Sequence, residues 1–318
     1  MKTNILITSA GQRVALVKCF QETLKRYFPD GKVFTTDMNP HMAPAAYVSD
    51  GCFNVPRCTS EDYIEALLTI CLGNNIGMIV PTIDTELAIM SANKDLFVKH
   101  GIFVSVSDYD FVMMCRDKRN TGEFFERHGI RVPKAIDKYH PTFPMFAKPY
   151  DGSLSTNLHY IKNAEDLTEE ILNDPKLLFM EYIDKEAYKE YTVDMYYGRD
   201  NKVKCIVPRE RIKVRAGEIN KGLTEKEPLT RYLSDRLGTI EGCVGCICIQ
   251  LFLNRQNGDV VGIEINPRFG GGYPQTYAAG GNYPGYLIRE CFLGEQIEYS
   301  EDWKDHLLML RYDDAVYV

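Results

Sequence analysis

Apolar and polar positions along the first hundred residues predict strands and helices that follow one another in turn. Short runs of apolar and β-branched residues predict four strands, at residues 2–8, 33–37, 77–81 and 103–106. Apolar residues at helical spacing predict three helices between them, at residues 14–27, 64–73 and 86–100. This alternation is typical of an α/β domain with a parallel sheet, whose functional edge lies at the carboxyl ends of its strands.

The pattern changes after Asp108. A helix is predicted from residue 117 to residue 128, and the Gly129 to Pro133 segment ends it. Five further strands are predicted, at residues 143–149, 177–183, 205–215, 245–255 and 260–265. Three later segments are expected to be a mobile loop, a helix and a short apolar strand, at residues 217–224, at residues 286–291 and near Leu307.

The composition indicates a globular protein, with room for two or three domains in its 318 residues. The net charge of −7 argues against an obligate nucleic-acid partner, since phosphate binding needs a basic surface. No run approaches the roughly 18 apolar residues that span a membrane, and the first residues lack the apolar stretch of a signal peptide. We therefore expect a cytoplasmic protein without a membrane partner.

The ten cysteines are expected to be reduced thiols, because the chain is long and shows no signal peptide. Cys243, Cys246 and Cys248 are close enough in sequence to suggest a zinc site. However, no second pair of cysteine or histidine residues has matching spacing, and the three cysteines run into a β pattern. A zinc site is therefore the less favoured interpretation.

The last two long strands are predicted to form a hairpin. Residues 256–258, Gln-Asn-Gly, are typical of the loop between two antiparallel strands. If these three residues form the loop, Arg255 faces Asp259 and Gln250 lies opposite Glu264.

Polar side chains of this hairpin form a candidate metal site. Because side chains alternate between the two faces of a strand, Glu264, Asn266 and Arg268 are expected to project together. Gln250 joins them from the first strand, and three glycines follow at residues 270–272. The oxygen atoms of Gln250, Glu264 and Asn266 suit Mg²⁺ that also binds phosphate and water. The alternative is an ordinary hairpin with a polar outer face.

Two basic segments are candidate sites for anions. Lys148 ends a predicted strand ahead of a loop with glycine and serine at residues 150–157, which places a cation and several donors near a polyphosphate. Four cations occur at alternate positions of a later strand, namely Arg209, Arg211, Lys213 and Arg215. Cations that share one face of a strand need anions nearby, such as phosphates, carboxylates or protein acids. The alternative is a solvated strand edge that its charges keep soluble.

The first hundred residues offer fewer candidates. Asp37 ends a strand where a nucleotide-binding fold would hold a ribose, but the G-x-G-x-x-G fingerprint is reduced to Gly11, so we reject an NAD site. Thr82, Asp84 and Glu86 follow the third strand, and they either reach a substrate or cap the next helix.

Together these segments resemble the ATP-grasp superfamily of ligases. Gln250, Glu264 and Asn266, closed by Pro267 and Arg268, are similar to the metal-binding end of carbamoyl-phosphate synthase large subunits and smaller carboxylate–amine ligases. Other segments similar to the family follow its order, at residues 117–133, 147–157, 177–183 and 190–194.

The resemblance implies a Rossmann-like parallel-sheet domain (pre-ATP-grasp) at residues 1–107 and an ATP-grasp domain at residues 108–318. Within the latter, a small mobile lid is expected at about residues 132–180. The resemblance assigns nucleotide binding to Lys118, Lys148, Ser153, Glu181, Ile183 and Glu190. The lysines would contact phosphates, Ser153 would lie in the covering loop, and that loop departs from the family in having a single glycine.

For the remaining nucleotide ligands, the resemblance places adenine against the backbone of Glu181 and Ile183 and the ribose hydroxyls on Glu190. Arg268 would hold the transferred phosphoryl group or the acyl phosphate. Arg211 is the second candidate for a catalytic role.

The implied activity is that of an ADP-forming ligase that uses ATP and Mg²⁺, with Mn²⁺ as an alternative ion. ATP would phosphorylate a small-molecule carboxylate, and an amine would attack the acyl phosphate. Carbamate phosphorylation, as in carbamoyl-phosphate synthase, ranks lower because that enzyme carries two ATP-grasp halves. A non-catalytic ATP-binding protein remains a further alternative, and the oligomeric state is left open between a monomer and a homodimer.

Overall fold

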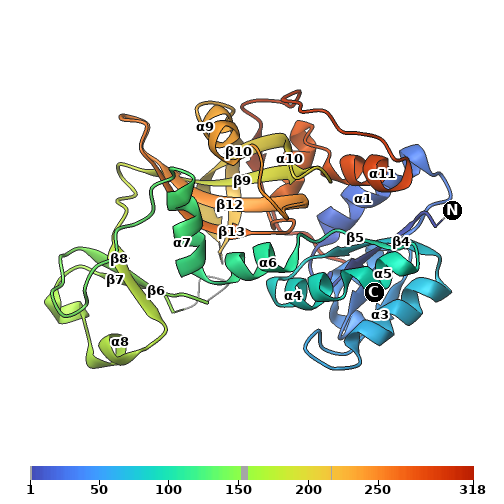
Figure 1. Cartoon of the computed structure of the whole chain (residues 1–318), viewed down its shortest axis with the longest axis horizontal. Helices are drawn as coiled ribbons and strands as arrows, with labels where there is room; N and C mark the ends of the chain where they lie inside the picture. Colours follow the sequence, from blue (N-terminus) through green and yellow to red (C-terminus); the bar gives the residue numbers. More distant parts are fainter. Residues whose placement is uncertain (1, 152–156, 216) are drawn as a thin grey trace.

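The computed structural model describes residues 2–151, 157–215 and 217–318, which form three β-sheets with helices packed against them (Figure 1). The first part of the chain builds a five-stranded sheet, and the second half builds a six-stranded sheet. A three-stranded sheet comes between them in sequence and lies at one end of the molecule in Figure 1.

The five-stranded sheet is parallel throughout, as predicted, and its strand order is β3-β2-β1-β4-β5. Its strands are β1 (Asn4–Thr8), β2 (Val33–Asp37), β3 (Cys52–Asn54), β4 (Ile76–Pro81) and β5 (Phe103–Val104). Its helical segments are α1 (Val14–Tyr27), the 3-10 turn η1 (Pro40–Met42), α2 (Pro44–Val48), α3 (Tyr63–Gly73), α4 (Asp84–Ala92) and α5 (Lys94–Lys99). Ile5 and Ile7 pack on the α1 side and Leu6 packs on the α3 side, so both faces are covered.

The six-stranded sheet is antiparallel, with the order β13-β12-β9-β10-β11-β14. Its strands are β9 (Lys189–Tyr197), β10 (Val203–Arg215), β11 (Glu218–Thr224), β12 (Gly245–Leu253), β13 (Val260–Asn266) and β14 (Leu308–Leu310). The helices around it are α6 (Tyr109–Arg116), α7 (Lys118–Arg127), α9 (Leu229–Leu237), α10 (Tyr273–Ala279) and α11 (Tyr283–Phe292).

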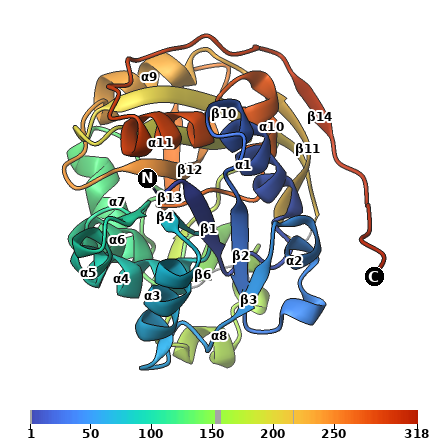
Figure 2. The same cartoon turned by 90° about the vertical axis from the view of Figure 1, so that its right-hand side faces the viewer.

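The two faces of this large sheet have different surroundings. Val193 and Ile249 lie on one face, in a core with residues of α7 and α9. Tyr196 and Val207 lie on the other face, in a core shared with β1, α1, α10 and α11. Helix α1 lies beside α10 and α11 (Figure 2). Further along the same strands this second face becomes polar, and the candidate site lies there.

The three-stranded sheet has the order β7-β6-β8 and is antiparallel. It consists of β6 (Met145–Pro149), β7 (His159–Ile161) and β8 (Leu177–Glu181), with the 3-10 turn η2 (Ala164–Asp166) and helix α8 (Glu169–Asn173). Met145, Ala147, Ile161 and Phe179 belong to a small core separate from the other two sheets. The sheet falls within the predicted lid at about residues 132–180, and the motion of that lid stays a prediction.

Two predicted elements differ from the structure. Residues 86–100 belong to two helices, because the Asn93 side chain donates to the carbonyl of Ile89 at 2.9 Å where α4 ends. The predicted loop at residues 217–224 is wrong, since Glu218–Thr224 is strand β11, paired with β10 and β14. Strands β3, β7 and β9 and helices α2, α6, α8, α9 and α10 were not predicted. Among the described helices, none has the length and apolar character needed to cross a membrane.

Candidate functional site

The β12–β13 hairpin places Gln250 opposite Glu264 and Cys248 opposite Asn266. The first pair confirms the predicted register at the polar end of the hairpin. Residues that face each other across antiparallel strands lie on the same side of the sheet. Gln250, Glu264 and Asn266 therefore share one face.

The tip of the hairpin differs from the prediction by one residue. Asn254, rather than Arg255, pairs with Asp259, and its backbone N–H donates to the Asp259 carbonyl at 2.9 Å. A register shift between Leu251 and Gln250 leaves Ile263 as the extra residue of a β-bulge. The bulge compensates the shift at the tip, so the prediction for Gln250 holds.

Glu264 is the centre of the polar contacts on this face. Its Oε1 accepts a hydrogen bond from Nδ2 of Asn266 at 3.1 Å, and its Oε2 lies 3.8 Å from Nζ of Lys118. Gln250 donates through Nε2 to Glu190. One carboxylate and two amide side chains offer oxygen ligands alone, which fits Mg²⁺ that takes further ligands from phosphate and water.

Two lysines from different elements approach Glu264. Lys118 is the first residue of α7, and Asp117 caps this helix by accepting a hydrogen bond from the Arg119 N–H at 2.9 Å. Asp117 thus lies just before the helix rather than inside it. Lys148 lies on β6 and is 8% exposed. Burial lowers the pKa of Lys148 to about 8; the Glu264 carboxylate opposes this shift and the Lys118 ammonium adds to it.

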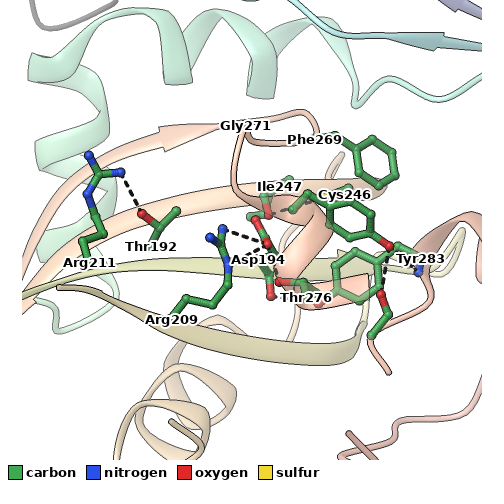
Figure 3. A network of polar contacts seen from close by, with 12 residues as sticks. Thr192, Asp194, Arg209, Arg211, Cys246, Ile247, Phe269, Gly271, Thr276 and Tyr283 are labelled. Carbon is green, nitrogen blue, oxygen red and sulfur yellow. Dashed lines mark hydrogen bonds and ion pairs between the residues drawn. The ribbon is translucent and has the colours of Figure 1, made fainter. Parts of the chain in front are cut away.

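Arg211 of β10 contacts the same cluster. Its Nε lies 2.9 Å from Oε1 of Glu190, and its guanidinium donates to Oγ1 of Thr192 at 3.2 Å and to the Gly217 carbonyl at 3.0 Å. Figure 3 shows Arg211 directed towards Thr192 of the neighbouring strand. Because Glu190 also accepts from Gln250, it connects Arg211 with the candidate metal ligands.

Arg209, two residues earlier, is fully buried. Its Nε donates to Oδ2 of Asp194 at 3.1 Å, and the Thr276 hydroxyl donates to the same oxygen at 2.5 Å (Figure 3). A Cβ atom on Gly272 would lie 2.2 Å from one terminal nitrogen of Arg209, so a larger residue would clash there. The buried pair therefore fixes where the glycine segment lies on the sheet.

The predicted row of four cations on one face is wrong. The register of β10 against β11 shifts after Arg211, which ends the alternation. Arg215 pairs with Asp313 at the surface, and Lys213 is exposed. Arg209 and Arg211 instead meet acidic side chains of the protein on the candidate-site face.

Arg268 joins the large sheet to the parallel sheet. Its Nε and a terminal nitrogen donate to the two carboxylate oxygens of Asp84 at 2.8 and 2.6 Å. The terminal nitrogen also donates to Oδ1 of Asn266 at 3.2 Å. The hydroxyl of Thr82 bonds to the backbone of β1 and Glu86 is fully buried, so both hold the fold. No side chain caps the N-terminus of α4, so the capping interpretation of Thr82 and Asp84 is wrong.

Glu181 and Ile183 lie at the end of β8. The Glu181 carboxylate is 2.9 Å from a terminal nitrogen of Arg131 and accepts from the Lys134 N–H at 3.1 Å. Arg131 forms a backbone bridge with Val261 of β13, so it joins Glu181 to the large sheet. Ile183 is buried. Ser153, the remaining predicted nucleotide ligand, lies outside the described residues.

Several residues around the site gave no usable signal in the sequence. Arg311, which follows β14, donates to the Gly271 carbonyl at 2.9 Å and to Glu218 at 2.5 Å. Arg13, in the loop after β1, donates to the Thr82 carbonyl at 3.3 Å. Their partners are distant in sequence, and no local pattern identifies such pairs.

Two sequence families match the chain. Residues 5–105 match the family described as PylC-like, N-terminal domain, and residues 173–314 match the family described as ATP-grasp in the biosynthetic pathway with Ter operon. No curated protein matches the sequence significantly.

Several solved structures share the fold. The biotin carboxylase domain of the Hydrogenobacter thermophilus 2-oxoglutarate carboxylase has a TM-score of 0.72 at 16% identity, over 95% of this chain and 72% of that one. N5-carboxyaminoimidazole synthetase from Staphylococcus aureus has a TM-score of 0.71 at 16% identity, over 96% and 79%. Biotin carboxylase from Campylobacter jejuni has a TM-score of 0.70 at 17% identity, over 95% and 73%.

Residues 173–314 thus match an ATP-grasp family, and nearly the whole chain shares the fold of these solved structures. The predicted fold, a parallel-sheet domain followed by an ATP-grasp fold, is confirmed.

Proposed function

We propose that the chain is an ADP-forming carboxylate–amine ligase that depends on ATP and Mg²⁺. One observation carries this proposal: Lys118 and Lys148 approach Glu264, which contacts Asn266, which contacts Arg268. This row of contacts contains two ammonium groups, a set of oxygen ligands and a guanidinium. Such a row suits a polyphosphate whose terminal phosphoryl group is transferred.

The residues of this row take different roles. Lys118 and Lys148 bind the phosphates, and Gln250, Glu264 and Asn266 would hold Mg²⁺. An ion held there would offset the negative charge of the phosphates. We propose that Arg268 binds the phosphoryl group while it is transferred.

The nucleoside is assigned to residues on either side of the phosphate site. We propose that Glu190 accepts the ribose hydroxyls, where its contact with Arg211 orients the carboxylate. Arg211 would stabilise charge during transfer. Adenine would lie against the backbone of Glu181 and Ile183, where buried apolar groups exclude water.

The reaction proceeds by two displacements. A carboxylate oxygen of the substrate attacks the γ-phosphorus, and ADP leaves with the electron pair of the broken P–O bond. An amine nitrogen then attacks the acyl carbon, phosphate leaves and the nitrogen loses a proton. Positioning and electrostatic stabilisation supply most of the rate, so no covalent nucleophile of the protein is needed.

The substrates are accordingly a small-molecule carboxylate and a small-molecule amine. The net charge of −7 supports neither nucleic acid nor an anionic membrane surface as a partner. We place the protein in the cytoplasm and leave the choice between a monomer and a homodimer to measurement.

Hydroxylamine trapping tests this function without knowledge of the amine. The full chain is incubated with ATP, Mg²⁺, hydroxylamine and one member of a panel of carboxylic acids, with bicarbonate included. We expect a hydroxamate and an equal amount of ADP with at least one acid. AMP and pyrophosphate as products, or no ATP turnover with any acid or with bicarbonate, would contradict the proposal.

A further inference from the structure

Arg13 is a partly buried cation beside the site, and it has no ion-pair partner among the described residues. It lies in the loop after β1, at the edge of the parallel sheet where such sheets bind ligands. Within the described residues its side chain makes one hydrogen bond, to the Thr82 carbonyl at 3.3 Å. The undescribed positions include no aspartate or glutamate. A guanidinium has five N–H donors, so most of those of Arg13 remain for a ligand.

The charges around Arg13 do not balance. Asp84 is bound through both oxygens by Arg268, and Glu218 is bound by Arg311. Burial and the guanidinium of Arg268 lower the pKa of Arg13 below its ordinary value, although Glu218 and Asp84 oppose this. The two carboxylates that act on Arg13 are thus each paired with another guanidinium, which leaves Arg13 as a cation without a paired carboxylate among the described residues. A partly buried charge of this kind is stabilised by an anion.

The turn between β4 and α4 holds Arg13 close to the phosphoryl-transfer residues. Thr82 accepts from Arg13, and Asp84, two residues later, accepts from Arg268. Arg268 also contacts Asn266 of the candidate metal site. An anion on Arg13 would therefore lie next to the place where the acceptor reacts.

We propose that Arg13 binds a carboxylate of the acceptor substrate other than the group that reacts. This inference rests on the proposed function of the same site. The uncompensated charge is a single one, which matches a carboxylate; a phosphate dianion would in addition be repelled by Asp84 and Glu218. The acceptor is thus an acidic molecule, an amino acid or a dicarboxylic acid, and Arg13 selects it by a charge-assisted bidentate contact.

Calorimetry on the full chain with MgADP tests this inference. The probes are the L-amino acids, succinate and glutarate, each paired with an analogue in which one carboxylate is a carboxamide. Arg13→Gln removes the charge, and Arg13→Lys keeps it without the planar fork. Arg26→Gln, at an exposed arginine in the last turn of helix α1, is the matched control. Thermal unfolding of each variant reports whether it folds.

We expect at least one acid to bind roughly 10- to 100-fold more tightly than its carboxamide, as for a hydrogen-bonded charge pair. Arg13→Gln should abolish this preference, Arg13→Lys should keep part of it, and MgADP should bind all variants equally. The inference is overturned if no acid binds more tightly than its carboxamide, or if the preference survives in Arg13→Gln.

The trapping assay separates this inference from the proposed function. If an acid binds through Arg13 but no member of the acid panel yields ADP or hydroxamate, the inference stands and the proposed function fails. If Arg13→Gln forms hydroxamate from the acid with an unchanged KM, the proposed function stands and the inference fails.

Discussion

Glu264 is the residue on which the proposed chemistry depends most directly, because it contacts both a lysine and Asn266, a second proposed metal ligand. Glu264→Gln keeps the shape of the side chain and removes its negative charge. We expect Mg²⁺-dependent ADP formation to fall by at least about 100-fold, since the ion loses its only carboxylate ligand in this set. Stopped assays over a range of Mg²⁺ concentrations measure the effect.

The control for this change is Glu298→Gln, a glutamate that is exposed and far along the chain from the hairpin. Its activity should match that of the unchanged protein. Equal activity of Glu264→Gln at low Mg²⁺ would remove Glu264 from the metal site.

Asp194 and Arg209 form an ion pair with both side chains fully buried. Asp194→Asn leaves the guanidinium buried without its charge partner, so we expect a loss of about 3–5 kcal/mol in the free energy of unfolding. The double variant Asp194→Leu with Arg209→Met removes both charges and should lose less than Asp194→Asn alone. Urea unfolding followed by circular dichroism measures these differences.

An exposed ion pair provides the comparison. Glu295→Gln removes the ion pair with Arg289, and the side chains of both residues are partly exposed. We expect it to change the free energy of unfolding by less than about 1 kcal/mol. A similar small change for Asp194→Asn would show that the buried pair contributes little.

At the scale of a single element, helix α7 positions Lys118 because the helix begins at that residue. Asp117→Ala removes the cap and should lower the free energy of unfolding by about 0.5–2 kcal/mol. The first turn should also fray, so the KM for ATP should rise while kcat changes less. Steady-state kinetics with varied ATP measure this.

Asp62→Ala is a matched control for the cap. Asp62 stands at the same position before α3, but its side chain makes no capping hydrogen bond. Its loss should therefore leave stability nearly unchanged. If both variants lost the same stability, the effect of Asp117→Ala would not come from capping.

Elements with a regular pattern could be predicted from the sequence, and irregular ones could not. Strands β1, β2 and β4 are short runs rich in apolar and β-branched residues, and helix α1 has strong apolar periodicity, so their prediction succeeded. Strand β11 contains Asn220, Lys221 and Gly222, which are poor strand formers. It is a strand because β10 and β14 supply hydrogen bonds on its two sides. Such tertiary pairing is invisible in a local pattern.

The same distinction holds for the site. Gln250 and Glu264 could be paired from the sequence because one loop connects their strands. The contact between Arg268 and Asp84 joins residues 184 positions apart, and no local signal predicts it. The row of four cations failed because a shift of register cannot be read from alternation alone.

At the scale of the whole molecule, the three-stranded sheet should respond to nucleotide binding as a unit separate from the other two sheets. Its core is small and separate, and the charge of Glu264 in the large sheet acts on its Lys148. A non-hydrolysable ATP analogue with Mg²⁺ should therefore slow amide hydrogen exchange in β6 and β8, because phosphates would hold Lys148 against the large sheet. Hydrogen exchange with mass spectrometry resolves these strands.

Lys148→Ala should weaken this protection, while exchange in β1 and β4 stays as it is in the unchanged protein. Slow exchange in β6 without nucleotide, and no change upon its addition, would mean that this sheet is fixed and is no lid.

The core that β1 and α1 share with the large sheet has a consequence for how the chain can be recombined. Phe20 of α1 and Phe269, just after β13, pack edge to face with ring centres 5.5 Å apart. The two rings belong to segments that match different families, one on each side of residue 107. In a chimera that takes its PylC-like part from a relative, the residue at the position of Phe20 would pack against a Phe269 with which it has not evolved. Modular exchange in this chain thus requires Phe20 and Phe269 to be inherited as a pair, although the border between the families lies far from both.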